Sequence, residues 1–239
     1  HDKLDGIGWF TNETLKRITR SHPEHQFFFL FDRKYSDEFI FSDNITPIIA
    51  HPQSRHPYLW YLFFEAGVPV ALRKIRPDIF ISTDGWLPLH LKTKSIDVIH
   101  DLNFEHNPEN LTPIMYRYCH KNFPKFAEAA TRLATVSEFT RQDINKLYKI
   151  PFEKIDVVYN GSSDYYAPLS QEDQEKTKSQ FSNGCDYFLF VGSIHKRKNL
   201  DNIFRAFDKF KDTHNNDVKF IVVGNKKWWQ DNIEDSYNA

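Results

Sequence analysis

The sequence predicts an α/β protein built around parallel sheets. Short runs rich in β-branched and aromatic residues recur along the chain, and each is followed by a longer amphipathic segment; this alternation is typical of βα units. Most of the runs are almost continuously apolar, as strands are when helices cover both faces of their sheet. The expected strands span residues 27–31, 78–82, 96–100, 132–136, 155–159, 187–191 and 219–223.

Helices are expected between these strands, at residues 11–20, 110–123, 138–149 and 200–211. The last helix carries apolar residues at helical spacing, which predicts a single buried stripe. The stripe consists of Leu200, Ile203, Phe204, Phe207 and Phe210.

The longest apolar stretch, residues 57–72, is interrupted by Glu65. It is shorter than the roughly 20 residues that a membrane-spanning helix needs, so we expect it in the core. Its aromatic cluster leaves a position at a membrane surface open as an alternative.

A change of composition follows Asn160 and Gly161, a pair that favours a turn because both residues tolerate positive φ. We place a domain boundary here, between a first domain at residues 1–162 and a second at 163–239. The second segment has only two expected strands, too few for a closed α/β sheet. We therefore expect the second domain to be incomplete and both chain ends to be artificial boundaries.

The charge balance excludes some partners. Lysine and arginine number 31 and aspartate and glutamate 32, so the molecule has no overall positive field to hold nucleic acid. Cys119 and Cys185 cannot build a disulfide framework, which favours a cytoplasmic protein.

A basic loop, "HKRK" at residues 195–198, follows Gly192 at the end of an expected strand and precedes a helix that Asn199 is expected to cap. Helix N-termini at this edge of a parallel sheet favour anions. Arg197 would add a bidentate fork and Lys198 a point charge, which together suit a diphosphate. A solvated surface loop is the alternative interpretation.

A glycine loop occurs near the start of the chain, in "DGIGWFTNETLKRI". Gly6 and Gly8 would let backbone amides approach a ligand, before a helix that Thr11 is expected to cap. A tight turn explains the two glycines equally well.

A third feature is the segment "DVIHDLNF", in which an expected strand delivers His100 and Asp101 to its carboxyl end. Doubly wound sheets place their chemistry in the loops at that end. A structural hydrogen bond is the alternative, with Asp101 capping the next segment.

No metal site is expected from the sequence. The chain has no Asp-x-Asp pair to hold a divalent ion, no P-loop, no Gly-x-Ser-x-Gly and no His-Glu-x-x-His. Trp228 and Trp229 could stack on a sugar or pack under the sheet, and we do not assign them to the site.

Taken in order, these segments resemble the retaining GT-B glycosyltransferases of family four, the mannosyltransferase-like group 1 enzymes. The resemblance rests on "DGIGWFTNETLKRI", "DVIHDLNF", "ATVSEFTRQDINKLYKIP", "KIDVVYNGSSDYYAP", "YFLFVGSIHKRKNLDNIFRAF" and "FIVVGNKKWW". It implies a Rossmann-like first domain that binds the acceptor and a Rossmann-like second domain that binds a nucleotide-sugar donor. It also implies transfer of a hexose, with mannose favoured, to a glycan or lipid-linked acceptor in bacterial surface polysaccharide synthesis. Because no metal motif is present, we expect no cofactor, and peripheral contact with the inner face of the membrane stays open.

Carried over by position, Arg197, Lys198, Gly6 and Gly8 match residues that approach the donor diphosphate, and His100 matches a catalytic histidine beside the transferred sugar. Asp101 and Asn103 fall on the acceptor side. Asn160 and Gly161 match the crossover between domains.

Two features depart from the family pattern. Ser193 stands where many members have arginine, and the family's pair of glutamates would lie beyond Ala239, so we expect this segment alone to be inactive. The alternatives are a non-catalytic nucleotide- or glycan-binding Rossmann module acting as a partner subunit, and a nucleotide-sugar epimerase.

Overall fold

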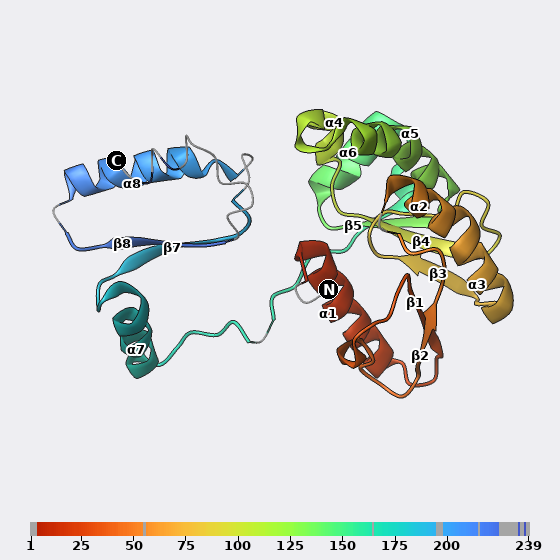
Figure 1. The fold of residues 1–239 in the computed structure, drawn as a ribbon, viewed down its shortest axis with the longest axis horizontal. Coiled ribbons are helices and arrows are strands. Elements are labelled where there is room, and N and C mark those ends of the chain that lie inside the picture. The colour runs from red at the N-terminus through yellow and green to blue at the C-terminus, as the bar shows by residue number, and fades with distance from the viewer. Residues whose placement is uncertain are drawn as a thin grey trace. The chain divides into compact units, whose positions relative to one another are not determined.

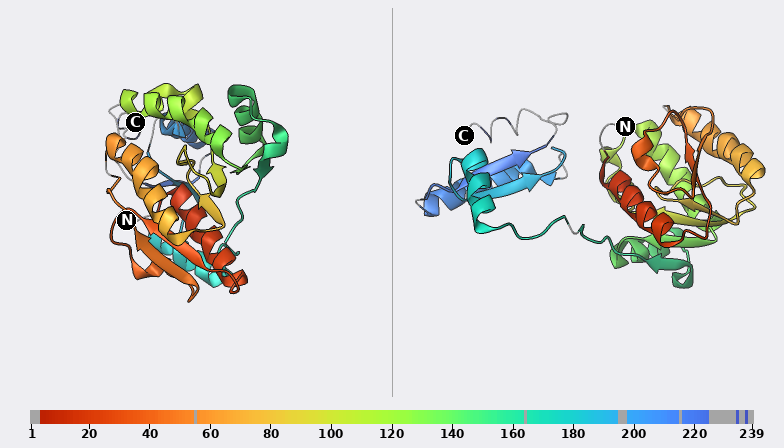
Figure 2. Two further views of the ribbon diagram at one scale, coloured as in Figure 1. Left: turned by 90° about the vertical axis from the view of Figure 1, so that its right-hand side faces the viewer. Right: turned by 90° about the horizontal axis from the view of Figure 1, so that it is seen from below.

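The computed structural model of the chain describes residues 4–54, 56–163, 165–194, 198–214, 216–224, 234 and 237. The chain divides into two compact units, residues 1–161 and 162–239, and each has its own parallel strands (Figures 1 and 2). Within the described residues, no helix has the length and apolar character needed to cross a bilayer.

The first unit contains six strands in two parallel sheets, which confirms the predicted α/β class. The strands are β1 (Phe27–Phe31), β2 (Ile45–Ile49), β3 (Ile79–Ser82), β4 (Lys94–Ile99), β5 (Arg132–Thr135) and β6 (Ile155–Val157). β1 pairs with β2, and the larger sheet has the order β3-β4-β5-β6. Since these four strands all pair in parallel, the loops that leave β3, β4 and β5 emerge at the same edge of the sheet.

Helices connect these strands. They are α1 (Gly6–Ser21), α2 (Pro57–Leu62), α3 (Val68–Ile75), α4 (Asn103–His106), α5 (Pro113–Ala129) and α6 (Glu138–Tyr148), with short 3₁₀ turns at Asp37–Phe39, Pro108–Asn110 and Phe152–Lys154. The side chain of Thr112 caps α5 by accepting a hydrogen bond from the backbone amide of Met115. The side chain of Ser137 caps α6 in the same way, with the amide of Thr140 as donor.

The main core lies between the larger sheet and these helices. Phe126 and Ala127 of α5 and Ile144 of α6 are almost fully buried against Ile99 and Leu133. This arrangement places β4, and the loop that follows it, on a rigid support.

The apolar stretch 57–72 is helical, and the part of it from Phe63 onward contributes to the core as expected. It forms α2, a π-helical turn η2 (Phe63–Gly67) and most of α3. Phe63, Val68 and Leu72 are buried in a second core cluster, whereas Tyr61 and Leu62 are about half exposed.

The prediction for the first helix was wrong at its start. α1 begins at Gly6, and Asp5 rather than Thr11 caps it, with Asp5 Oδ1 accepting the amide of Gly8 at 2.8 Å. The two glycines therefore lie in the first helical turn instead of in a loop before it. Leu4 leaves little room for a side chain at Gly8, while the position at Gly6 is open.

The second unit contains helices α7 (Gln171–Ser182) and α8 (Leu200–Thr213) and strands β7 (Tyr187–Val191) and β8 (Lys219–Val223). The strands pair in parallel, and α8 covers one face of them (Figure 1). Leu200 and Phe204 of the predicted stripe are buried, and Ile203 packs beside them. Trp228 and Trp229 lie outside the described residues.

Candidate functional site

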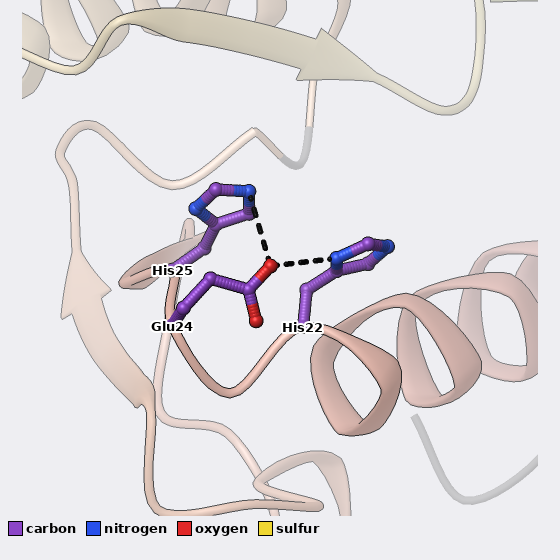
Figure 3. Close-up of side chains that lie close together, drawn as sticks. All are labelled: His22, Glu24 and His25. Carbon is purple, nitrogen blue, oxygen red and sulfur yellow. Dashed lines mark hydrogen bonds and ion pairs between the residues drawn. The ribbon is translucent and has the colours of Figure 1, made fainter.

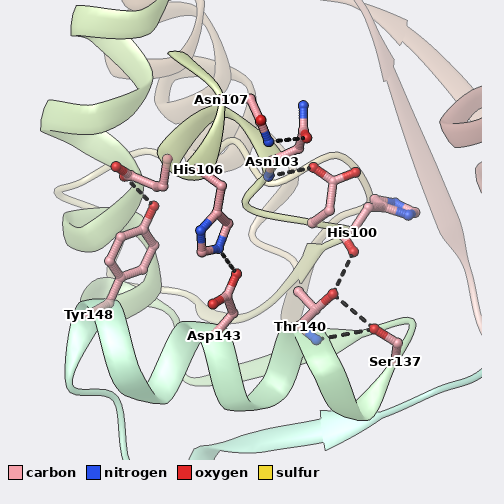
Figure 4. A network of polar contacts seen from close by, with 10 residues as sticks. His100, Asn103, His106, Asn107, Ser137, Thr140, Asp143 and Tyr148 are labelled. Atoms are coloured by element: carbon pink, nitrogen blue, oxygen red, sulfur yellow. Dashed lines mark hydrogen bonds and ion pairs between the residues drawn. The ribbon is translucent and has the colours of Figure 1, made fainter. Parts of the chain in front are cut away.

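The first candidate site lies where β4 ends. Strand β4 stops at Ile99, so His100 is the first residue of the loop, as its place in the sequence predicted. The carbonyl of His100 accepts a hydrogen bond from Thr140 Oγ1 at 3.1 Å, which ties this loop to the first turn of α6 (Figure 4). The His100 ring points away from that network and is half buried.

Two contacts hold the His100 ring. Its Nε2 lies 2.9 Å from the carbonyl oxygen of Thr83, in the loop after β3. A carbonyl only accepts hydrogen bonds, so Nε2 carries the proton and Nδ1 of the neutral ring is an acceptor. The ring of Phe10 meets the imidazole edge-on, with centroids 4.8 Å apart and planes at 89°.

Helix α1 is also fixed to this edge of the sheet. Thr11, next to Phe10, donates from its hydroxyl to Thr83 Oγ1 at 2.9 Å. The N-terminal turn of α1, with Gly6 and Gly8, therefore belongs to the same side of the unit as His100. Sequence reasoning missed the roles of Phe10, Thr11 and Thr83 at this site, because each depends on a contact between distant segments.

Asp101 and Asn103 are held by local hydrogen bonds. Asp101 Oδ1 accepts the amide of Asn103 at 3.0 Å, and Asn103 Oδ1 accepts from Asn107 Nδ2 at 3.0 Å (Figure 4). Leu102 rather than Asp101 occupies the N-cap position of α4, and its side chain makes no capping bond. Asp101 instead closes a short turn by accepting from Asn103, the first residue of α4.

Helix α4, which follows, is held against its neighbours by hydrogen bonds between side chains. His106 Nε2 lies 2.5 Å from Asp143 Oδ2 of α6, and His120 Nδ1 of α5 lies 2.6 Å from Glu105 Oε2. Tyr148 donates to Glu105 Oε1 at 2.8 Å, and burial together with this carboxylate raises the pKa of that phenol well above its usual range. The tyrosine thus stays neutral and donates.

Asp97 is a buried carboxyl within β4, two residues before the strand ends. It is fully buried, and neither carboxyl oxygen has a hydrogen-bond partner among the described residues. Burial, and next the nearby Asp84, raise the pKa of Asp97 to about 8. The acid is therefore mainly neutral at pH 7.

Asp97 is expected to make stability fall as pH rises. Its pKa in the folded protein is about 8, against about 4 when unfolded. Folding therefore favours the protonated form. Between these two pKa values, each unit of rising pH lowers the free energy of unfolding by up to about 1.4 kcal/mol. Asp97→Asn should melt higher than wild type at pH 8 and much like it at pH 4.

Melting temperatures measured from pH 4 to 8 test this expectation. Asp78→Asn is the control, because Asp78 is exposed just before β3 and this change should leave the slope unaltered. If melting temperature depended on pH in the same way for Asp97→Asn and wild type, the raised pKa of Asp97 would be wrong.

The second candidate site lies at the start of α8 in the second unit. Of the predicted cations, Lys198 is described and exposed, whereas Arg197 lies outside the described residues. Asn199 occupies the N-cap position with φ 55°, but its side chain makes no capping hydrogen bond. Its Oδ1 instead accepts from Asn202 Nδ2 at 2.9 Å.

The prediction that Asn199 caps α8 was therefore wrong, and the difference has a chemical consequence. The first amides of a helix have no acceptor inside the helix. Here the Asn199 side chain does not cap the helix, and the dipole of α8 favours negative charge at this end.

The strand ends beside this helix approach each other closely. Gly192 donates its amide to the Val223 carbonyl at 2.9 Å. A β-carbon on Gly224 would lie 2.1 Å from the Gly192 oxygen, so only glycine fits at that position. The loop that leads to the basic segment thus starts from a fixed point.

The predicted hinge residues, Asn160 and Gly161, are exposed and end the first unit. A β-carbon on Gly161 would meet no atom within 4 Å. Packing therefore does not explain the choice of glycine there.

Two family models match this chain. The model described as "Glycosyltransferase Family 4" matches residues 4–163, and that described as "Glycosyl transferases group 1" matches residues 171–238. The two matches together run through both units.

Curated relatives include the O-antigen chain mannosyltransferase B of Escherichia coli, 22% identical over 95% of this chain and 62% of the relative. The O-antigen chain mannosyltransferase RfbU of Salmonella typhimurium is 25% identical over 72% of this chain and 45% of the relative.

Solved structures with a similar fold include a glycosyltransferase from Rickettsia africae, with a TM-score of 0.62 at 17% identity over 95% of this chain and 61% of that one. WaaG, a glycosyltransferase involved in lipopolysaccharide biosynthesis, gives 0.67 at 13% identity over 98% and 65%. The chain thus spans less than two thirds of the length of each of these proteins.

Proposed function

The chain belongs to glycosyltransferase family 4, and from this membership we propose that the protein transfers a hexose, with mannose favoured, from a nucleoside diphosphate sugar to a glycan or lipid-linked acceptor. Its fold is the predicted GT-B type, matching both solved glycosyltransferases. The names of the two O-antigen relatives support mannose and a surface polysaccharide product. The observation that carries the proposal is that the family models match both units.

The second unit would bind the donor. As the bond between sugar and phosphate breaks, negative charge grows on the diphosphate while the sugar becomes oxocarbenium-like. Lys198, Arg197 and the start of α8 would stabilise that charge more in the transition state than in the ground state, which lowers the barrier. In this proposal the two cations neutralise the diphosphate, as a divalent metal ion does in other enzymes that act on nucleotide sugars, so no cofactor is required.

The first unit would bind the acceptor and contribute His100. With Nε2 fixed on the Thr83 carbonyl, Nδ1 can accept a hydrogen bond from a sugar hydroxyl. We assign no covalent nucleophile and propose retention at the anomeric carbon. Gly6 and Gly8 would face the donor diphosphate, and Asp101 and Asn103 would lie on the acceptor side.

Two further parts of the proposal concern the whole protein. Asn160 and Gly161, exposed at the end of the first unit, would serve as the hinge. A lipid-linked acceptor would bring the protein to the inner face of the membrane.

A transfer assay on the full-length protein tests the function. The protein is incubated with a panel of nucleoside diphosphate hexoses and with lipid-linked and glycan acceptors, and released nucleoside diphosphate is measured with and without acceptor. Proton NMR of the product gives the anomeric configuration. Release that depends on an acceptor, with retention, is expected; no release with any donor would reject the enzyme in favour of a binding module.

His100 gives a sharper test within the same assay. His100→Ala should lower kcat/KM about 10- to 100-fold, the effect of losing one hydrogen bond of about 1.4–2.7 kcal/mol. His100→Asn should recover part of the loss, because the amide of asparagine can stand in for Nδ1. His90→Ala, at an exposed histidine, is the control, and equal activity of all three variants would remove His100 from the site.

A further inference from the structure

We propose that His22, Glu24 and His25 form a binding site for a divalent transition-metal ion such as Zn²⁺. The three residues lie between the end of α1 and the start of β1, in the segment "SHPEHQ". The site is independent of the proposed transferase function.

The three side chains already meet at one point (Figure 3). His22 Nδ1 lies 2.9 Å from Glu24 Oε1, and His25 Nε2 lies 3.7 Å from the same oxygen. One nitrogen from each imidazole and one carboxylate oxygen all lie within 4.8 Å of one another. An ion about 2.0–2.2 Å from each of them would need only small rotations of the side chains.

The backbone that carries these side chains is held by Asn44, which comes from the residues just before β2. Its Nδ2 donates to the carbonyls of Thr19, His22 and His25 at 3.1, 3.0 and 3.0 Å. Ser42 Oγ donates to Asn44 Oδ1 at 2.6 Å and fixes the orientation of the amide. The positions of both histidines are thus set before any ion arrives.

The set of donor atoms determines the kind of ion. Two imidazole nitrogens and one carboxylate oxygen suit Zn²⁺, Ni²⁺, Co²⁺ and Cu²⁺, while Mg²⁺ and Ca²⁺ prefer oxygen ligands. The side chains of His22, Glu24 and His25 are 51%, 58% and 64% exposed. An ion therefore reaches the site directly from solvent and keeps water in its remaining positions.

The location assigns the ion a structural role. His22 ends α1, where its amide donates to Ile18, and His25 lies two residues before β1. A bound ion would fasten the helix end to the strand start. His22 lies about 18 Å along the helix axis from Phe10, at 1.5 Å per residue, so the ion would not touch the His100 site.

The test is isothermal titration of ZnCl₂ into tag-free protein at pH 7.5, because an affinity tag would itself bind the metal. Wild type should bind one Zn²⁺ and should not bind Mg²⁺ at the same concentration. His22→Ala and His25→Ala should each weaken binding at least tenfold, and Glu24→Gln should weaken it less than either. Zn²⁺ should also raise the melting temperature of the wild type, and not that of the two histidine variants.

His90→Ala is the matched control, since it removes an exposed histidine outside the cluster, and it should bind Zn²⁺ as tightly as wild type. Circular dichroism verifies that each variant is folded. The proposal is overturned if wild type gives no heat of binding, or if the two histidine variants bind as tightly as wild type.

Discussion

Replacing either Lys198 or Arg197 with alanine in the full-length protein is expected to lower kcat about a hundredfold, close to 3 kcal/mol of transition-state stabilisation. Both residues belong to the basic loop before α8, and the capping side chain of that helix is engaged elsewhere. The loop cations and the first helical amides would share the charge of the departing diphosphate. Initial rates at saturating donor measure the effect.

Lys209→Ala is the matched control for this pair of variants. Lys209 is an exposed lysine on the same helix, in its C-terminal half, so its removal changes the net charge equally and should leave kcat unaltered. If Lys198→Ala and Arg197→Ala retained wild-type kcat with every active donor, the leaving-group role would be wrong.

Gly67→Ala is expected to lower the free energy of unfolding of the first unit by about 3 kcal/mol, the upper end of what overpacking costs. A β-carbon at this position would lie 2.3 Å from the His51 carbonyl oxygen. The obstacle is backbone, so relief requires moving η2 or the chain at His51. Because Val68 is buried next to it, such a movement would disturb the second core cluster.

Thermal denaturation measures this effect, and a melting temperature lower by roughly 6–12 °C is expected for a unit of this size. Gly161→Ala is the control, because a β-carbon there meets nothing within 4 Å. Equal melting temperatures for the two variants would show that η2 adjusts freely.

The strands could be predicted where they are continuously apolar. Residues 27–31, 187–191 and 219–223 were expected as strands and form β1, β7 and β8 with the same bounds. β2 was missed because Pro47 lies in its middle. Proline has no amide hydrogen to donate and is therefore rare inside sheets. In this two-stranded sheet β2 pairs with β1 alone, where Pro47 lies opposite Phe29, so the missing donor is tolerated.

Helix α7 was also missed, since its sequence is almost entirely polar. It begins at a cap that the sequence does contain, with Ser170 accepting the amide of Asp173, and ion pairs such as Lys176 with Glu172 lie along it. A search for amphipathic segments does not find a helix with so little apolar surface.

The candidate site could be predicted only where position along the chain decides it. His100 was found because a strand end delivers it to the loops, and β4 does end at Ile99. Phe10 and Thr83, which fix its ring, come from other segments and are brought there by tertiary packing alone. Asp97 was overlooked as part of an apolar run, although an acid inside a buried strand was the available signal.

Binding of a diphosphate by the basic loop and the start of α8 can be measured by isothermal titration. Nucleoside diphosphates are titrated into the full-length protein, alongside the matching monophosphates and nucleosides. A diphosphate should bind at least tenfold more tightly than its monophosphate, and Arg197→Ala/Lys198→Ala should abolish the difference. Equal affinity for both, or an unchanged preference in the double variant, would contradict it.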